Sequence, residues 1–355
     1  MADKVYVMVD VRPAIAVHGE LLGTRWVVTT APTPCEFVVP RRDPRPLAEH
    51  PSGPNRGLLP PDVGEATTAI NHNLQGWQRE PDIDYDDPHM WGAVYQSEPA
   101  MDRVLGATVS YALAVADYDG DDDPDARWGF VEGLNAAIRQ WVSAMTEWIE
   151  VLSGRIISVE RTSEPYPSNT EAHPLRFDAP TGSAVGFARP PTITVSVYSE
   201  SSPVTLADWT AAATQVNAAL PPPLAHVLLS AARAASYVGD LRRAVIDATT
   251  ACEVALSGAI RSRLWTSMPP DALDQLVGRL SGLMDLRDFH HRGLAQVRDV
   301  SRSQLDRDLA ALRNCVAHAG YRPTAQEARA ALDVAKRLVR EIAPVDTVLL
   351  QTSPG

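Results

Sequence analysis

The chain has few lysines, few cysteines and no long apolar run. Only Lys4 and Lys336 are lysines among its 355 residues, so arginine carries nearly all of the positive charge. The cysteines, at positions 35, 252 and 315, form no CxxC pair, so they are expected to be buried free thiols in a reducing compartment. No apolar stretch approaches the ~18–20 residues that cross a bilayer. We therefore expect a cytoplasmic protein with no membrane partner.

Negative charge is concentrated in the first two thirds of the sequence. The chain has a formal net charge of −12; residues 1–223 hold 15 Lys and Arg against 30 Asp and Glu, and residues 224–355 hold 17 against 14. Contacts between basic side chains and phosphates supply much of the affinity for nucleic acids. The acidic balance thus makes the chain a poor general nucleic-acid binder, and any contact with RNA is expected only in residues 224–355.

Residues 1–200 are predicted to form a mixed α+β domain with long proline-rich loops. Alternating or continuous apolar runs predict strands at residues 4–11, 26–30, 37–39, 104–116, 156–159 and 192–197. A stripe of apolar residues at three- and four-residue steps predicts a long core helix at 128–152. Residues 40–62 and 163–191 are rich in proline and are predicted as loops, and residues 63–76 as a short helix. No catalytic motif is present in this part.

An acidic run between residues 117 and 125 is a weak candidate for a calcium loop. Calcium takes oxygen ligands, and the candidate ligands are Asp117, Asp119, Asp121 and Asp125. They resemble the calcium loops of integrin-type propeller repeats, although Asp122 stands where that pattern has glycine and the run occurs once. The simpler interpretation is a solvated acidic turn before the long helix.

The domain boundary is expected within residues 201–223. Thr205, with Asp208 three places later, predicts the start of a helix running to about residue 220. The run Pro221-Pro222-Pro223 ends that helix. Residues 201–223 are therefore interpreted as a helix and linker, residues 224–343 as an all-α bundle and residues 344–355 as a loose tail.

The back half reads as a series of amphipathic helices. Helices are predicted at residues 224–237, 241–264, 273–284, 305–318 and 325–342, with a loop at 288–292. Gly320 is a natural stop after the fourth of these. Thr324 and Glu327 form a capping box at the start of the last. Glu253, within the second, is a candidate supporting residue that either faces solvent or pairs with an arginine.

The segment Arg313-Asn314-Cys315-Val316-Ala317-His318 resembles the motif of the HEPN superfamily, an arginine and a histidine separated by a short spacer that begins with a polar residue. The segment Asp240–Leu256 resembles an early helix of the same superfamily. Together they identify residues 220–343 as HEPN-like, a helical fold found in many prokaryotic toxin, antiviral and RNA-processing proteins. The resemblance does not cover the first 200 residues.

The resemblance implies a metal-independent endoribonuclease that needs no cofactor and cleaves RNA with the 2′-hydroxyl as nucleophile. His318 would be the general base, because an imidazole exchanges protons near neutral pH. Arg313 would stabilise the phosphate, and Asn314 would orient His318 or bind the phosphate. It also implies a homodimer whose two motifs face each other, and a partner that acts as an antitoxin or a sensor.

A second interpretation remains open. The same three residues near a helix end can hydrogen-bond neighbouring loops and cap the C-terminus, leaving a non-catalytic dimerisation or ligand-binding protein whose N-terminal domain senses a partner. Residues 313 and 318 lie ~140° apart on an ideal helix. Arg313 must therefore reach round the helix, or the helix must fray before Gly320. Cys315 is expected to be a half-buried packing thiol.

Overall fold

The structure is a computed structural model. It describes residues 3–31, 33–42, 56–59, 61–63, 91–98, 101–120, 123–154, 156–157, 176–178, 203–280 and 282–345. The chain divides into two compact units. The first comprises residues 1–149 and 157–220, and the second comprises residues 150–156 and 221–355.

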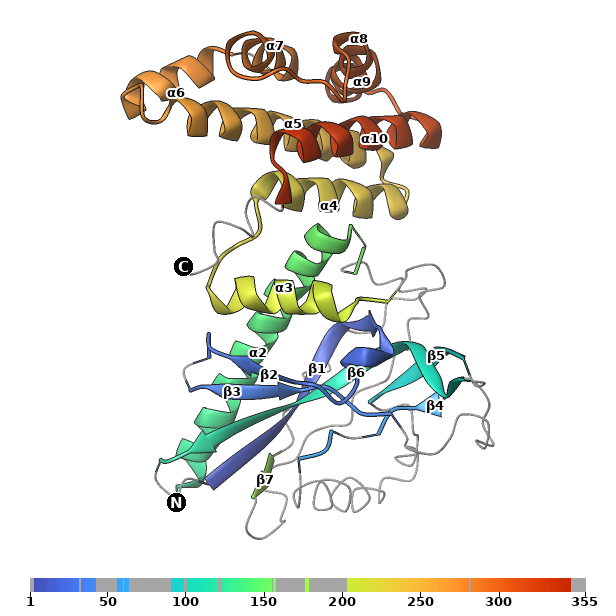
Figure 1. The fold of residues 1–355 in the computed structure, drawn as a ribbon, viewed down its shortest axis with the longest axis vertical. Coiled ribbons are helices and arrows are strands. Elements are labelled where there is room, and N and C mark those ends of the chain that lie inside the picture. Colours follow the sequence, from blue (N-terminus) through green and yellow to red (C-terminus); the bar gives the residue numbers. More distant parts are fainter. Residues whose placement is uncertain are drawn as a thin grey trace. The chain divides into compact units, whose positions relative to one another are not determined.

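The first unit is built on an antiparallel sheet (Figure 1). Its strands are β1 (Asp3–Val17), β2 (Arg25–Val28), β3 (Cys35–Val38), β4 (Arg56–Gly57), β5 (Gly92–Glu98), β6 (Arg103–Tyr118) and β7 (Arg176–Asp178). The order along the main path is β2-β3-β6-β1-β7, with β5 on β6 and β4 on β5. The α+β class expected from the sequence is confirmed at this level.

Strand β6 organises the sheet because it is long enough to pair with three strands. One stretch of it, residues 113–116, pairs with β3, and another, residues 103–109, pairs with β5. It also pairs with β1 over most of its length. The register between β1 and β6 shifts between Asp10 and Ile15, where Pro13 offers no N–H to the ladder.

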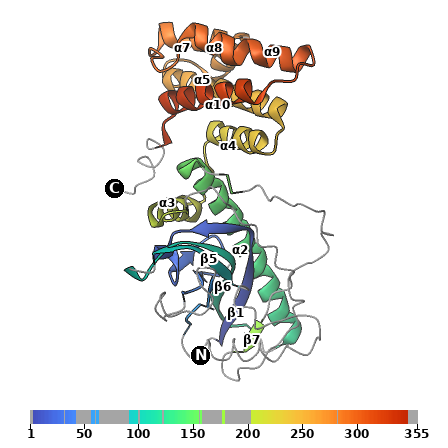
Figure 2. The ribbon, with the colours of Figure 1, turned by 90° about the vertical axis from the view of Figure 1, so that its right-hand side faces the viewer.

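Two helices, α2 (Pro124–Ser153) and α3 (Leu206–Asn217), lie against the sheet (Figure 2). Aromatic side chains make part of this contact. Phe37 of β3 lies 5.2 Å from Trp141 of α2 and 6.2 Å from Trp209 of α3, measured between ring centroids. Asn217 at the end of α3 accepts from Trp141 Nε1 and donates to the carbonyl of Val27. The helix that the sequence placed in a linker is thus part of the first unit.

The second unit is all helical in its described residues. It contains α4 (Leu224–Tyr237), α5 (Leu241–Leu264), α6 (Pro270–Arg279), α7 (Leu283–Gly293), α8 (Arg302–Leu305), the π-helical turn η4 (Asp306–Ala310), α9 (Ala311–His318) and α10 (Ala325–Ile342). Helix α5 is central, since it contacts α4, α10, α7 and α9. Figure 1 shows α5 and α10 between α4 and the layer formed by α7, α8 and α9.

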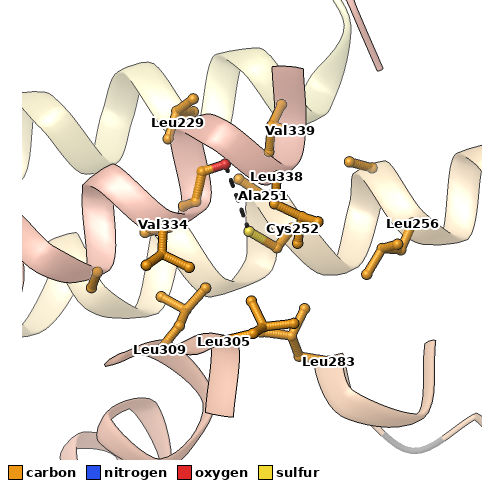
Figure 3. Close-up of a cluster of buried hydrophobic side chains, with 14 of the residues drawn as sticks. Leu229, Ala251, Cys252, Leu256, Leu283, Leu305, Leu309, Val334, Leu338 and Val339 are labelled. Atoms are coloured by element: carbon orange, nitrogen blue, oxygen red, sulfur yellow. Dashed lines mark hydrogen bonds between the residues drawn. The ribbon is translucent and has the colours of Figure 1, made fainter. Parts of the chain in front are cut away.

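The core of the second unit gathers around the small-residue stripe of α5 (Figure 3). Ala248 and Cys252 are fully buried, and the Cys252 thiol points to the carbonyl of Ala335 on α10 at 4.0 Å. Leu305 and Leu309 close the core from the α8–η4 side. The stripe consists of Ala244, Ala248, Cys252, Ala255 and Ile260, all buried. Its small side chains let neighbouring helices approach closely and so make this face of α5 a packing surface.

Several predicted boundaries were wrong. The helix expected at 273–284 is two helices, because the chain breaks between α6 and α7, where Gly282 has φ +92°. The loop expected at 288–292 belongs to α7. Ile156 and Ile157 are not in a strand. The segments 158–159, 192–197 and 64–76 lie outside the described residues. Strand β4 falls within the predicted loop 40–62, and β7 falls within the predicted loop 163–191.

Both predicted helix starts are confirmed as capping boxes. The Thr324 hydroxyl accepts from the backbone N–H of Glu327, and the Glu327 carboxylate accepts from the N–H of Thr324 at 2.7 Å. Thr205 and Asp208 make the same reciprocal pair at the start of α3.

Replacing Thr324 with alanine is expected to lower the free energy of unfolding by about 1 kcal/mol, because one N–H of the first turn of α10 loses its acceptor. Urea denaturation followed by circular dichroism measures this change. Thr324→Asn keeps a side-chain acceptor and should retain most of the stability. Equal losses in the two variants would show that the cap does not supply this stability.

Candidate functional site

The motif lies at the end of one helical segment that runs from α8 through η4 into α9. The segment contains a π-helical turn, seen in the bond from the N–H of Ala311 to the carbonyl of Asp306. Leu305, Leu309 and Val316 are buried along it, which holds the opposite face toward solvent. The helix ends at His318, and Gly320 follows with φ +67°, as the sequence predicted.

All three motif residues lie within α9, so the helix does not fray before His318. Asn314 and His318 are four residues apart and share one face of the helix. Arg313 starts from a different face, yet its Nη1 donates to Asn314 Oδ1 at 3.3 Å. The long arginine side chain therefore reaches round toward the face that carries Asn314 and His318.

The motif is open to solvent. Asn314 and His318 are exposed and Arg313 is half-buried. A buried structural role, with the guanidinium and the imidazole sealed inside the bundle, is thus not what the structure shows. These groups are placed where an external phosphate could meet them.

Glu253 does not join the motif by any hydrogen bond or ion pair recorded among the described residues. It is half-buried on α5, where its charge acts on its neighbour: burial first, and then the Glu253 carboxylate, raise the pKa of Cys252. Of the two alternatives for Glu253, a solvent-facing position or a pairing with an arginine, the second is not seen among the described residues.

A further arginine lies at the end of α9. Arg242, in the first turn of α5, donates from Nη2 to the carbonyl of Val316 at 3.1 Å. Cations suit the C-terminal end of a helix, where carbonyls are left without helical partners. The sequence contained Arg242 in the HEPN-like segment but gave no sign of this contact, which joins residues 74 positions apart.

The expectation that Cys315 is half-buried was wrong, because its thiol is exposed, whereas Cys35 and Cys252 are buried. On α9, position 315 lies next to the buried Val316 and next to the exposed Asn314. With Val316 filling the core position, the preceding residue is turned to solvent.

A thiol reagent should therefore label one cysteine in the native protein and three after denaturation. Burial raises the pKa of Cys35 to about 11 and also raises the pKa of Cys252, so little thiolate forms at neutral pH. Mass spectrometry of maleimide-treated protein identifies the labelled positions, and Cys315→Ser should abolish native labelling. Rapid native labelling of Cys252 would contradict the buried core.

No group of three or more His, Cys, Asp or Glu side chains within the described residues could hold a metal ion. Asp117 is the second-last residue of strand β6, Asp119 follows the strand, and Asp125 lies in the first turn of α2. Asp121 is outside the described residues. His290 is buried in α7, and Nδ1 of His291 accepts from the N–H of Val297 at 3.0 Å. His290 is thus part of the packed interior, and His291 holds the loop that follows α7.

None of the described helices is long and apolar enough to cross a bilayer. Comparisons of the chain with models of protein families, with curated proteins and with solved structures found no match.

Proposed function

We propose that the second unit is a HEPN-like, metal-independent endoribonuclease of the toxin or phage-defence kind. The observation that carries this proposal is the arrangement on α9. The Arg313 guanidinium is bonded to Asn314 on the helix face that Asn314 shares with His318, and all three side chains reach solvent. The first unit would sense a signal or restrain the enzyme.

The chemistry assigns one role to each group. His318 takes the proton from the 2′-hydroxyl, the 2′-oxygen attacks the adjacent phosphorus, and the bond from phosphorus to the 5′-oxygen breaks. The Arg313 guanidinium stabilises the negative charge that grows on the phosphate oxygens during this step. Solvent water delivers a proton to the leaving 5′-oxygen, the His318 imidazolium returns its proton to solvent, and the products are a 2′,3′-cyclic phosphate and a 5′-hydroxyl end.

A second copy of the chain is part of this proposal. Val238, at the end of α4, is 60% exposed, and Ile246 on α5 is 36% exposed. They flank the start of α5, which Arg242 ties to the end of α9. Exposed apolar side chains around the start of α5 suit a homodimer interface, and the contact of α5 with the end of α9 would bring two motifs toward each other there.

The same apolar side chains also favour the second candidate function, a non-catalytic dimerisation or ligand-binding protein. The two are separated by incubating the full chain with RNA in EDTA and sequencing the ends. Cleavage that yields cyclic phosphates, and that a 2′-deoxy substitution at the cut position blocks, supports the nuclease. A dimer that leaves a broad panel of RNAs intact supports the alternative.

A further inference from the structure

A second feature of the helical unit is a groove of about 550 Å³ between the α8–η4 segment and α10. Its polar lining is formed by Gln304, Asp308, Asp333, Lys336, Arg337 and Arg340. The motif on α9 does not contribute to it. Asp308 precedes His318 by ten residues, so the groove and the motif lie roughly 15 Å apart along the same helical segment.

The groove carries an excess of positive charge. Asp308 is already held by Arg307, which donates to both carboxylate oxygens at 2.6 and 2.8 Å. This contact is the main reason why the pKa of Asp308 is lowered. Of the two carboxylates that line the groove, only Asp333 is not paired with an arginine of the described residues through its carboxylate oxygens. The lining holds three cations, so positive charge is in excess.

The three cations of the groove differ in their freedom. Arg337 is fixed, because it donates to the backbone carbonyls of Asp299 and Asp333. Lys336 and Arg340 are exposed and make no recorded hydrogen bond or ion pair with the described residues. They stand four residues apart on α10, about 5–6 Å between Cβ atoms.

The positive charge of Arg340 affects the pKa values of two neighbouring side chains. Burial first, and Arg340 among the further causes, lower the pKa values of His226 and Arg233. Within the groove itself Arg340 shares the lining with Lys336 and Arg337, and an anion that enters would stabilise these three like charges.

We propose that this groove binds the phosphodiester backbone of a nucleic-acid strand, with Lys336 and Arg340 each contacting a phosphate. The groove is open and lies on the same helical segment as the motif, so a strand held there can continue toward α9. Gln304 and Asp333 can accept hydrogen bonds from sugar hydroxyls, which would favour RNA over DNA. The choice of a nucleic acid over other phosphate compounds rests on the proposed nuclease function. The anion site itself rests on the lining of the groove and is independent of that function.

The test is binding of a fluorescent 2′-deoxy oligonucleotide to the full chain, measured by anisotropy at several salt concentrations. This probe has no 2′-hydroxyl, so the readout does not depend on cleavage. The double variant Lys336→Ala/Arg340→Ala should weaken binding about tenfold and reduce the slope of log affinity against log salt by about 1.4, two contacts at roughly 0.7 each. RNA of the same sequence should bind more tightly than the deoxy probe.

The matched control is Arg263→Ala/Arg329→Ala, which removes two exposed arginines outside the groove and should change the affinity less than twofold. An equal loss of oligonucleotide affinity in both double variants, or no loss in either, would overturn the proposal that the groove binds the strand. Binding of poly-glutamate with the same dependence on Lys336 and Arg340, without binding of the oligonucleotide, would also overturn it in favour of an acidic peptide. If His318→Ala cleaves like the wild type while the groove variant loses binding, the nuclease fails and the groove stands.

Discussion

His318→Ala is expected to reduce RNA cleavage by about 10²–10⁴-fold, the contribution of a positioned general base. His318 is the last residue of α9 and is exposed, so removing its imidazole leaves the packing of Leu309 and Val316 intact. The variant should bind RNA as the wild type does. Single-turnover cleavage in EDTA separates the loss in the chemical step from any change in binding.

Cys315→Ser is the control for this experiment. Cys315 is exposed on the same helix, three residues from His318, and its replacement should leave cleavage unchanged. Arg313→Ala should reduce cleavage by about 10²–10³-fold, because the growing charge on the phosphate loses its cation. Cleavage by His318→Ala at the wild-type rate would remove the imidazole from the mechanism and with it the main role assigned to α9.

The helical unit was predictable where local patterns and packing agree. Helices α4 and α5 begin and end at the predicted residues, and the capping box of Thr324 and Glu327 fixed the start of α10. In each case an apolar or small-residue stripe coincides with a cap or a proline at the end. Such agreement between local preference and tertiary burial is what makes a helix readable from sequence.

Helix α7 was missed because two of its buried residues are polar. Arg287 and His290 are only 7% and 6% exposed, although both are residue types usually found near the surface. The charge of Arg287 is met by the adjacent Asp288 carboxylate at 2.9 Å. The buried apolar residues of α7, Leu283 and Leu286, lie in its first half, so the polar run that follows them was interpreted as a loop.

Candidate site residues could be proposed from the sequence, but their contacts could not. The spacing of Arg313 and His318 indicated a candidate motif, and helical geometry placed the two residues on different faces. In the structure the Arg313 guanidinium donates a hydrogen bond to Asn314 Oδ1, and this contact depends on the rotamer of the arginine side chain. The bond from Arg242 to Val316 depends on how α5 meets α9. Neither of these two hydrogen bonds can be predicted from a local sequence pattern.

Arg233→Met is expected to destabilise the second unit by about 3 kcal/mol, in the range for removing one side of a buried charge arrangement. The Arg233 guanidinium donates to the carbonyl of Gly154 at 2.7 Å and to that of Glu150 at 3.4 Å. Burial lowers the pKa of Arg233, while the nearby Glu150 carboxylate opposes that shift. That carboxylate is itself buried, 7% exposed, and accepts from Ser230 Oγ at 2.9 Å.

Methionine keeps the volume of the arginine stem but removes a positive charge close to a buried negative one, and it leaves the carbonyl of Gly154 without this donor. Hydrogen exchange of the α4 and α5 amides reports the free energy of opening of this unit. Arg329→Met, on the exposed side of α10, should change that free energy by less than about 0.5 kcal/mol. The double variant Glu150→Gln/Arg233→Met should be less destabilised than the sum of its single variants, because the second change removes the charge that the first leaves uncompensated. Strict additivity would mean that the two groups do not interact and that the cost of Arg233→Met comes from the lost hydrogen bonds alone.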